Sequence, residues 1–201
     1  MNINFLNIKT MKTIKFYAMT VMAIAMLASC SDDDDTPEVV EEEEAITRIV
    51  LTFINQADAN DTVVLTWDDT NGDEEVDDNE KTVVGEFTAN GTYDAEIGLF
   101  NEDEDFLDED ILADQAGIDA HFFVYASTLD FTSMMRASDD YTRTDNNKLG
   151  VKTVWTAGAA GTGSISIELH HESPNVDDST GFGTAAGDDT DIDISFNAEI
   201  Q

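Results

Sequence analysis

The feature that most constrains the fold is a set of short segments in which apolar and polar residues alternate. In the segment 190–200 every second residue from 192 onward is apolar: Ile192, Ile194, Phe196, Ala198 and Ile200. Because successive side chains of a β-strand point to opposite faces, this pattern predicts a strand with one buried and one exposed face. Seven further runs are alternating or rich in β-branched and aromatic residues: 46–55, 62–67, 81–88, 92–100, 118–126, 149–155 and 163–171.

Eight such runs, separated by polar loops, predict an all-β domain over residues 46–201. The expected architecture is an antiparallel β-sandwich, Ig-like or similar. No Cys follows position 30, so packing or a bound metal has to stabilise the domain in place of disulfides. One segment departs from the pattern, because 105–116 spaces its apolar residues as a helix does. It predicts one short helix between two strands, ended by Gly117.

The N-terminal region has the features of an export signal. Lys12 and Lys15 precede the mostly apolar run Phe16–Leu27, which is too short for a membrane span of about 20 residues but suits a signal peptide. The sequence Leu-Ala-Ser-Cys that follows ends at Cys30, the only cysteine, and resembles the lipobox of bacterial lipoproteins. That resemblance implies cleavage after residue 29 and acylation of Cys30, which would anchor the protein to the outer membrane. The alternative is an ordinary secretory signal followed by an incidental cysteine.

The residues after Cys30 are strongly acidic. The segment 31–44 contains nine acids and little that is apolar, so residues 30–45 are predicted to be a disordered tether. The segment resembles the acidic export tag of surface-exposed lipoproteins in Bacteroidetes-type outer membranes, which implies a domain outside the cell. A plain flexible spacer is the alternative. The predicted organisation is a signal peptide (1–29), a lipidated tether (30–45) and a β-sandwich (46–201).

The charge balance restricts the partners of the chain. It has 44 Asp and Glu against 9 Lys and Arg, a formal net charge of −35. Nucleic acids and anionic lipid surfaces would be repelled, so no nucleic-acid partner is expected. Cations and basic partners would be attracted.

A candidate calcium site lies in the segment 69–80. Its oxygen-bearing side chains at positions 1, 3, 5, 7, 9 and 12 are Asp69, Asn71, Asp73, Glu75, Asp77 and Glu80. Ca²⁺ takes 6–8 oxygen ligands, and the spacing resembles an EF-hand loop, although Glu74 replaces the usual glycine. Strands rather than helices are expected on either side. The alternative is an acidic hairpin turn around Asn71-Gly72.

The three histidines, His121, His170 and His171, suggest a second site. Period-two alternation places His171 on the apolar face of its strand and His170 on the other face. If the strands 118–126 and 163–171 pair, His121 and His171 meet, and Glu172 could supply a carboxylate. Imidazole and carboxylate ligands suit Zn²⁺ or Cu²⁺. Packed or surface histidines without a metal are the alternative.

Nearly the whole chain resembles a group of small Bacteroidetes-type lipoproteins. The matching residues are TAGAAGTG at 156–163, ISIELHHE at 165–172 and Pro174-Asn175, together with the lipobox, the acidic loop and a His before an aromatic strand. That group usually carries Arg at the position of His170, which favours a role for His171. Its members are sometimes labelled type 1 periplasmic-binding-fold proteins, but such folds alternate strands and helices over a longer chain.

These features favour a non-enzymatic surface lipoprotein that binds a ligand or an outer-membrane receptor, for example in metal or nutrient uptake. A metal-dependent hydrolase is an alternative, although the sequence has neither HExxH nor GxSxG. A structural or adhesive surface protein is a second alternative.

Overall fold

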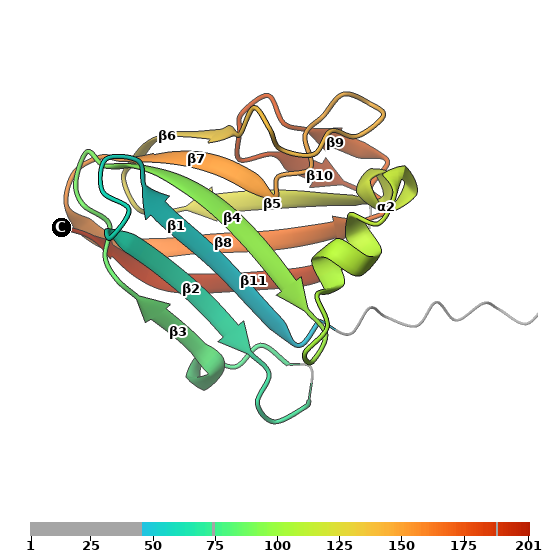
Figure 1. The fold of residues 1–201 in the computed structure, drawn as a ribbon, viewed down its shortest axis with the longest axis horizontal. Coiled ribbons are helices and arrows are strands. Elements are labelled where there is room, and N and C mark those ends of the chain that lie inside the picture. Colours follow the sequence, from blue (N-terminus) through green and yellow to red (C-terminus); the bar gives the residue numbers. More distant parts are fainter. Residues whose placement is uncertain (1–45, 74, 188) are drawn as a thin grey trace, which may run out of the picture. The chain divides into compact units, whose positions relative to one another are not determined.

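The chain forms two antiparallel β-sheets that pack face to face (Figure 1). This computed structural model describes residues 46–201 apart from 74 and 188, and the described residues belong to one compact unit. The predicted antiparallel all-β sandwich is confirmed. The predicted signal peptide, lipidated Cys30 and acidic tether lie outside the described residues. None of the helices in the described part of the chain is long and apolar enough to cross a membrane.

The larger sheet has six strands in the order β3-β2-β1-β4-β7-β6. Their bounds are β1 (Arg48–Asn55), β2 (Thr62–Asp68), β3 (Lys81–Val84), β4 (Thr92–Phe100), β6 (Phe131–Arg136) and β7 (Lys152–Ala157). The smaller sheet has three strands in the order β11-β8-β5, namely β5 (His121–Ser127), β8 (Gly161–His171) and β11 (Asp189–Ile200). The short strands β9 (Asn175–Asp177) and β10 (Thr184–Ala186) form a separate pair.

The core lies between the two sheets and is centred on Trp155 of β7, which is fully buried. Its indole makes edge-to-face contacts with four rings, Phe53, Tyr125, Phe131 and Phe182, at centroid distances of 5.0–5.8 Å. Tyr125 lies on the smaller sheet, so this contact joins the two layers. Aromatic pairs of this geometry add to the stabilisation that burial of apolar area provides.

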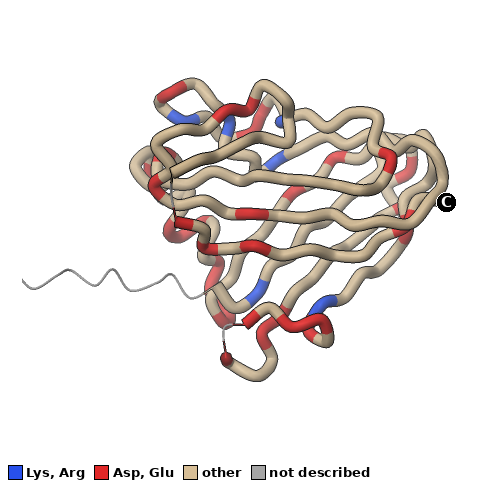
Figure 2. The backbone as a smooth tube through the Cα atoms, turned by 180° about the vertical axis from the view of Figure 1, so that it is seen from behind, with Lys and Arg blue, Asp and Glu red and all other residues tan. Residues whose placement is uncertain are grey.

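The acids of β11 from residue 193 onward lie where the alternation predicts, on exposed positions. In β11 the odd-numbered residues from 193 to 199 are exposed, whereas the even-numbered ones from 192 to 200 are buried. Figure 2 shows Asp and Glu spread along strands and loops, with few Lys and Arg among them. Exposed charge on β11, an edge strand of the smaller sheet, disfavours pairing with a strand of another molecule.

Three strand boundaries differ from the prediction by three residues or more. The strand expected over 81–88 ends at Val84, because Gly85 has φ +89° and lies against β2, where a Cβ would come within 2.1 Å of the Thr62 carbonyl oxygen. The strand expected from 149 begins at Lys152. The strand expected from 118 begins at His121, because Ile118–Ala120 belong to a helix.

The helical segment also differs from the prediction. Instead of one helix ended by Gly117, it contains a π-helical turn, η2 (Leu107–Ile111), and a short α-helix, α2 (Gln115–Ala120). Asp114 begins α2 by accepting hydrogen bonds from the N–H groups of Ala116 and Gly117. Gly117 therefore lies inside the helix. A Cβ at this position would come within 2.6 Å of the carbonyl oxygens of η2, so glycine allows the two turns to pack closely.

Candidate functional site

The structure brings His121 and His171 together at one end of the smaller sheet. His121 is the first residue of β5 and His171 the last of β8, and the two are directly opposite in the antiparallel register. Their rings stack in parallel planes with centroids 4.7 Å apart. His121 is 3% exposed and His171 is half-buried, so the pair lies at the edge of the core where solvent still reaches one ring.

The carboxylate of this cluster comes from Asp191, not from Glu172. One ligand atom from each of His121, His171 and Asp191 can be chosen so that all three lie within 4.8 Å of one another. Glu172 is exposed and follows β8 with φ +53°, and its N–H donates to the Ala120 carbonyl. Among the described residues, this is the one group of three potential metal ligands that the fold gathers.

A β-bulge places Asp191 in the cluster. The pairing of β11 with β8 shifts between Thr190 and Ile192, so Asp191 is the extra residue of β11 opposite the end of β8. Regular alternation from Ile192 would direct Asp191 to the solvent side. A bulge changes the direction of a side chain in this way, and bulges are frequent beside functional sites. Sequence alternation alone therefore could not find Asp191.

The orientation of the His121 ring is fixed by α2. Its Nδ1 lies 2.8 Å from the Gly117 carbonyl oxygen and donates to it, so in the neutral imidazole the lone pair is on Nε2. A metal-binding histidine usually has this arrangement, in which the second ring nitrogen donates to a carbonyl or carboxylate. The short helix that replaces the predicted strand start thus orients the imidazole.

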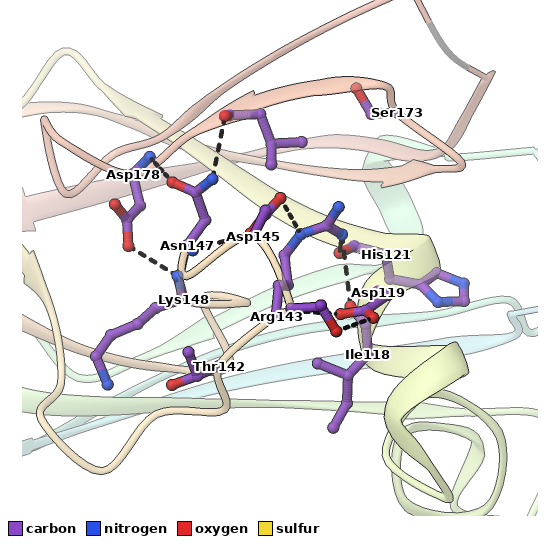
Figure 3. Close-up of polar contacts among 12 residues, drawn as sticks. Ile118, Asp119, His121, Thr142, Arg143, Asp145, Asn147, Lys148, Ser173 and Asp178 are labelled. Atoms are coloured by element: carbon purple, nitrogen blue, oxygen red, sulfur yellow. Dashed lines mark hydrogen bonds and ion pairs between the residues drawn. The ribbon is translucent and has the colours of Figure 1, made fainter.

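The backbone of His121 is held by Arg143, which is 7% exposed. Its guanidinium donates to the carbonyl oxygens of His121 and Ile118 and forms an ion pair with Asp145 at 3.2 Å. Figure 3 shows Arg143 reaching these carbonyls from the loop that follows β6, while the His121 ring points away from the polar network. Arg143 therefore fixes the position of His121 without blocking its ring.

The same loop is tied to α2 and to β9. Thr144 donates to both carboxylate oxygens of Asp119 from its N–H and its hydroxyl, and these hydrogen bonds hold the pKa of Asp119 below its ordinary value. The Asn147 side chain donates to the Val176 carbonyl and accepts from the Asp178 N–H. These contacts support the chain on one side of His121, and Figure 3 shows the one between Asn147 and Asp178.

His170 lies apart from the cluster, as alternation predicts. It is opposite Phe122 rather than His121, and its Nε2 lies 2.9 Å from a carboxylate oxygen of Glu168. His170 has the same side chain as its neighbour but a different environment. It is therefore a matched control for the role of His171.

The residues of the predicted calcium site lie in the loop between β2 and β3. Asp69, Asn71 and Asp73 each accept a hydrogen bond from a backbone N–H two or three residues further on. Glu75 and Asp77 are exposed, whereas Glu80 is buried at the end of η1 (Asp78–Glu80). Within the described residues, no three carboxylates of this loop converge.

The comparisons with known proteins give no family for the chain. No model of a known protein family, no curated protein and no solved structure matches it.

Proposed function

We propose that the protein is a lipid-anchored surface protein whose β-sandwich binds a divalent transition-metal ion, Zn²⁺ or Cu²⁺, through His121, His171 and Asp191. The observation that carries the proposal is the convergence of two imidazoles and one carboxylate from three different strands. Imidazole suits both ions, and a carboxylate completes a common ligand set. The net charge of −35 would raise the local concentration of cations around the domain.

The three ligand atoms would have to move slightly closer together to bind a zinc ion. Tetrahedral zinc with bonds of about 2.0–2.1 Å needs ligand atoms about 3.4 Å apart. The ligand atoms here lie within 4.8 Å of one another, and rotation of the half-buried His171 and Asp191 side chains would have to shorten these distances. His121 stays fixed by Gly117 and Arg143 and provides the rigid ligand.

Three protein ligands leave one position of a tetrahedral ion open. A non-enzymatic binding protein can use that position for exchange of the ion or for a group from a receptor. An ion with three ligands and a water is also the arrangement of catalytic zinc, so metal-dependent hydrolysis is the second candidate function. Turnover of ester, phosphate or peptide substrates that requires His121 would favour hydrolysis.

Titration with Zn²⁺ in millimolar Mg²⁺ tests the metal site, because Mg²⁺ occupies the non-specific acidic surface. We expect one zinc ion per chain, with affinity lowered at least about tenfold in His121→Ala, His171→Ala and Asp191→Asn. His170→Ala and Glu172→Gln should bind as the wild type does. Equal affinity in all five variants would mean that zinc binds only to surface carboxylates, and the proposal would fail.

The location is tested separately. Cys30→Ala should abolish labelling by a radioactive fatty acid and leave uncleaved precursor, and normal labelling would contradict the lipobox assignment. Replacement of Asp32–Asp35 by Ala should leave the protein lipidated but protected from protease added to intact cells. If protease still removes this variant, the acidic segment is not an export tag.

A further inference from the structure

A second cation site is indicated at the acidic loop between β2 and β3, independently of the histidine cluster. Glu80, the last residue of this loop, is only 5% exposed. One of its carboxylate oxygens, Oε1, accepts hydrogen bonds from the N–H and the hydroxyl of Thr70, both at 3.1 Å. Glu80 thus closes the loop onto its second residue. The carboxylate lies at the base of the loop, beside the peptide that joins Asp69 to Thr70.

The other oxygen of Glu80 has no such partner. Oε2 is buried and accepts no hydrogen bond from any described residue. A buried carboxylate oxygen without a donor is destabilising, and either a proton or a cation can relieve it. The nearest base in sequence, Lys81, is bound to Asp78 at 2.9 Å. Glu80, at the base of the loop, therefore carries a buried oxygen that no donor among the described residues satisfies.

The surroundings favour a cation at this atom. The segment 69–80 contains seven acids and no base, so its field attracts positive charge. The potential metal-ligand atoms of the segment are all oxygens, with no imidazole nitrogen or thiolate sulfur among them. Such a set suits hard cations such as Ca²⁺ rather than zinc or copper. The ends of the loop are held by the antiparallel pairing of Trp67 with Lys81, so its base is rigid.

We propose that this loop binds Ca²⁺ at its base, with Oε2 of Glu80 as the buried anchoring ligand. Ca²⁺ accepts irregular sets of 6–8 oxygens that include carbonyl groups and water, so three converging carboxylates are not required. Mg²⁺ demands near-octahedral geometry at shorter distances and keeps much of its water, so it binds less well to an irregular loop. The site would hold the β2–β3 connection in one conformation.

Terbium luminescence measures this binding directly, because Tb³⁺ replaces Ca²⁺ and Trp67, two residues before Asp69, can sensitise its emission. We expect Ca²⁺ to displace Tb³⁺ at least about tenfold more effectively than Mg²⁺ does. Glu80→Gln keeps the shape of the side chain and an acceptor for Thr70 but removes the charged ligand. This variant should weaken Ca²⁺ binding at least about tenfold, while the matched control Glu75→Gln, at an exposed position of the same loop, should change it less than about threefold.

Two results would overturn the proposal. Equal displacement of Tb³⁺ by Ca²⁺ and Mg²⁺ in the wild type would mean that cations only screen the negative charge of the loop. This result needs no variant. Equal effects of Glu80→Gln and Glu75→Gln would mean that Glu80 is not a ligand. Circular dichroism without calcium shows whether Glu80→Gln is folded; if it is not, the wild-type competition between the two ions decides.

Discussion

Replacement of Arg143 by Met should damage the histidine cluster without touching a ligand. Met keeps much of the apolar length of Arg but removes the guanidinium that donates to the His121 and Ile118 carbonyls. Because Arg143 is 7% exposed, the two carbonyls lose a donor in a place that water reaches poorly. His121 should then no longer be held at the start of β5.

The expected loss of stability in Arg143→Met follows from these contacts. A hydrogen bond from a charged donor contributes about 1.5–3 kcal/mol, and the contact with His121 is of this kind. The contact with Ile118 is longer, at 3.4 Å, and the ion pair is with the exposed Asp145, so each adds about 1 kcal/mol or less. The free energy of unfolding should fall by about 2–4 kcal/mol. Loss of a residue that orients a ligand typically lowers metal affinity about 10–100-fold.

Urea denaturation measures the first effect and zinc titration the second. The matched control is Arg48→Met, which removes the same charge from a half-buried arginine that stacks on Phe100 at 4.3 Å, in the other sheet. The control substitution should lower the free energy of unfolding by about 1 kcal/mol and leave the affinity for zinc unchanged. If Arg143→Met is destabilised but binds zinc as the wild type does, Arg143 supports the fold only and the positioning argument is wrong.

Three further predictions concern the fold. Trp155→Ala removes the side chain that joins the two sheets and should lower the free energy of unfolding by about 3–5 kcal/mol in urea, whereas a loss under 1 kcal/mol would contradict this account of the core. Gly85→Ala should lower the free energy of unfolding clearly more than Gly72→Ala does. Both glycines have positive φ, but only at Gly85 would the Cβ meet the Thr62 carbonyl. Equal urea midpoints of the two variants would refute this. Burial raises the pKa of Asp140 above its ordinary value, so its contribution to stability falls as the pH rises from 3.8 through that raised pKa. Asp140→Asn should therefore lower the free energy of unfolding more at pH 3.5 than at pH 7. The reverse order would mean that the pKa of Asp140 is not raised in the folded protein.

The sequence predicted the sandwich because alternation is a strong signal wherever one face of a strand is buried. It also predicted that His121 and His171 meet if the strands 118–126 and 163–171 pair, and the structure pairs these two strands with the two residues directly opposite. The strand β6 was missed because its sequence, FTSMMR, lacks a clear alternation of apolar and polar residues. The pair β9 and β10 was missed because each strand has three residues, too few to show a pattern.

Two features of the histidine site could not be found from the sequence. Asp191 enters the cluster through a bulge, and a bulge is set by the pairing of β11 with β8, which local sequence does not reveal. The hydrogen bond from His121 to Gly117 depends on α2, whose start at Asp114 was overlooked because the preceding residues already resembled a helix. The sequence therefore brought the two histidines together, whereas the carboxylate that the structure places beside them, Asp191, was not among the predicted ligands.

Anomalous diffraction at the zinc absorption edge, from crystals grown with Zn²⁺ and excess Mg²⁺, tests the metal site most directly. We expect a peak among the side chains of His121, His171 and Asp191, with ligand distances of about 2.0–2.2 Å. The peak should be absent from crystals of His171→Ala and present in those of His170→Ala. No peak at the cluster in the wild type, with zinc only at exposed carboxylates, would contradict the central claim.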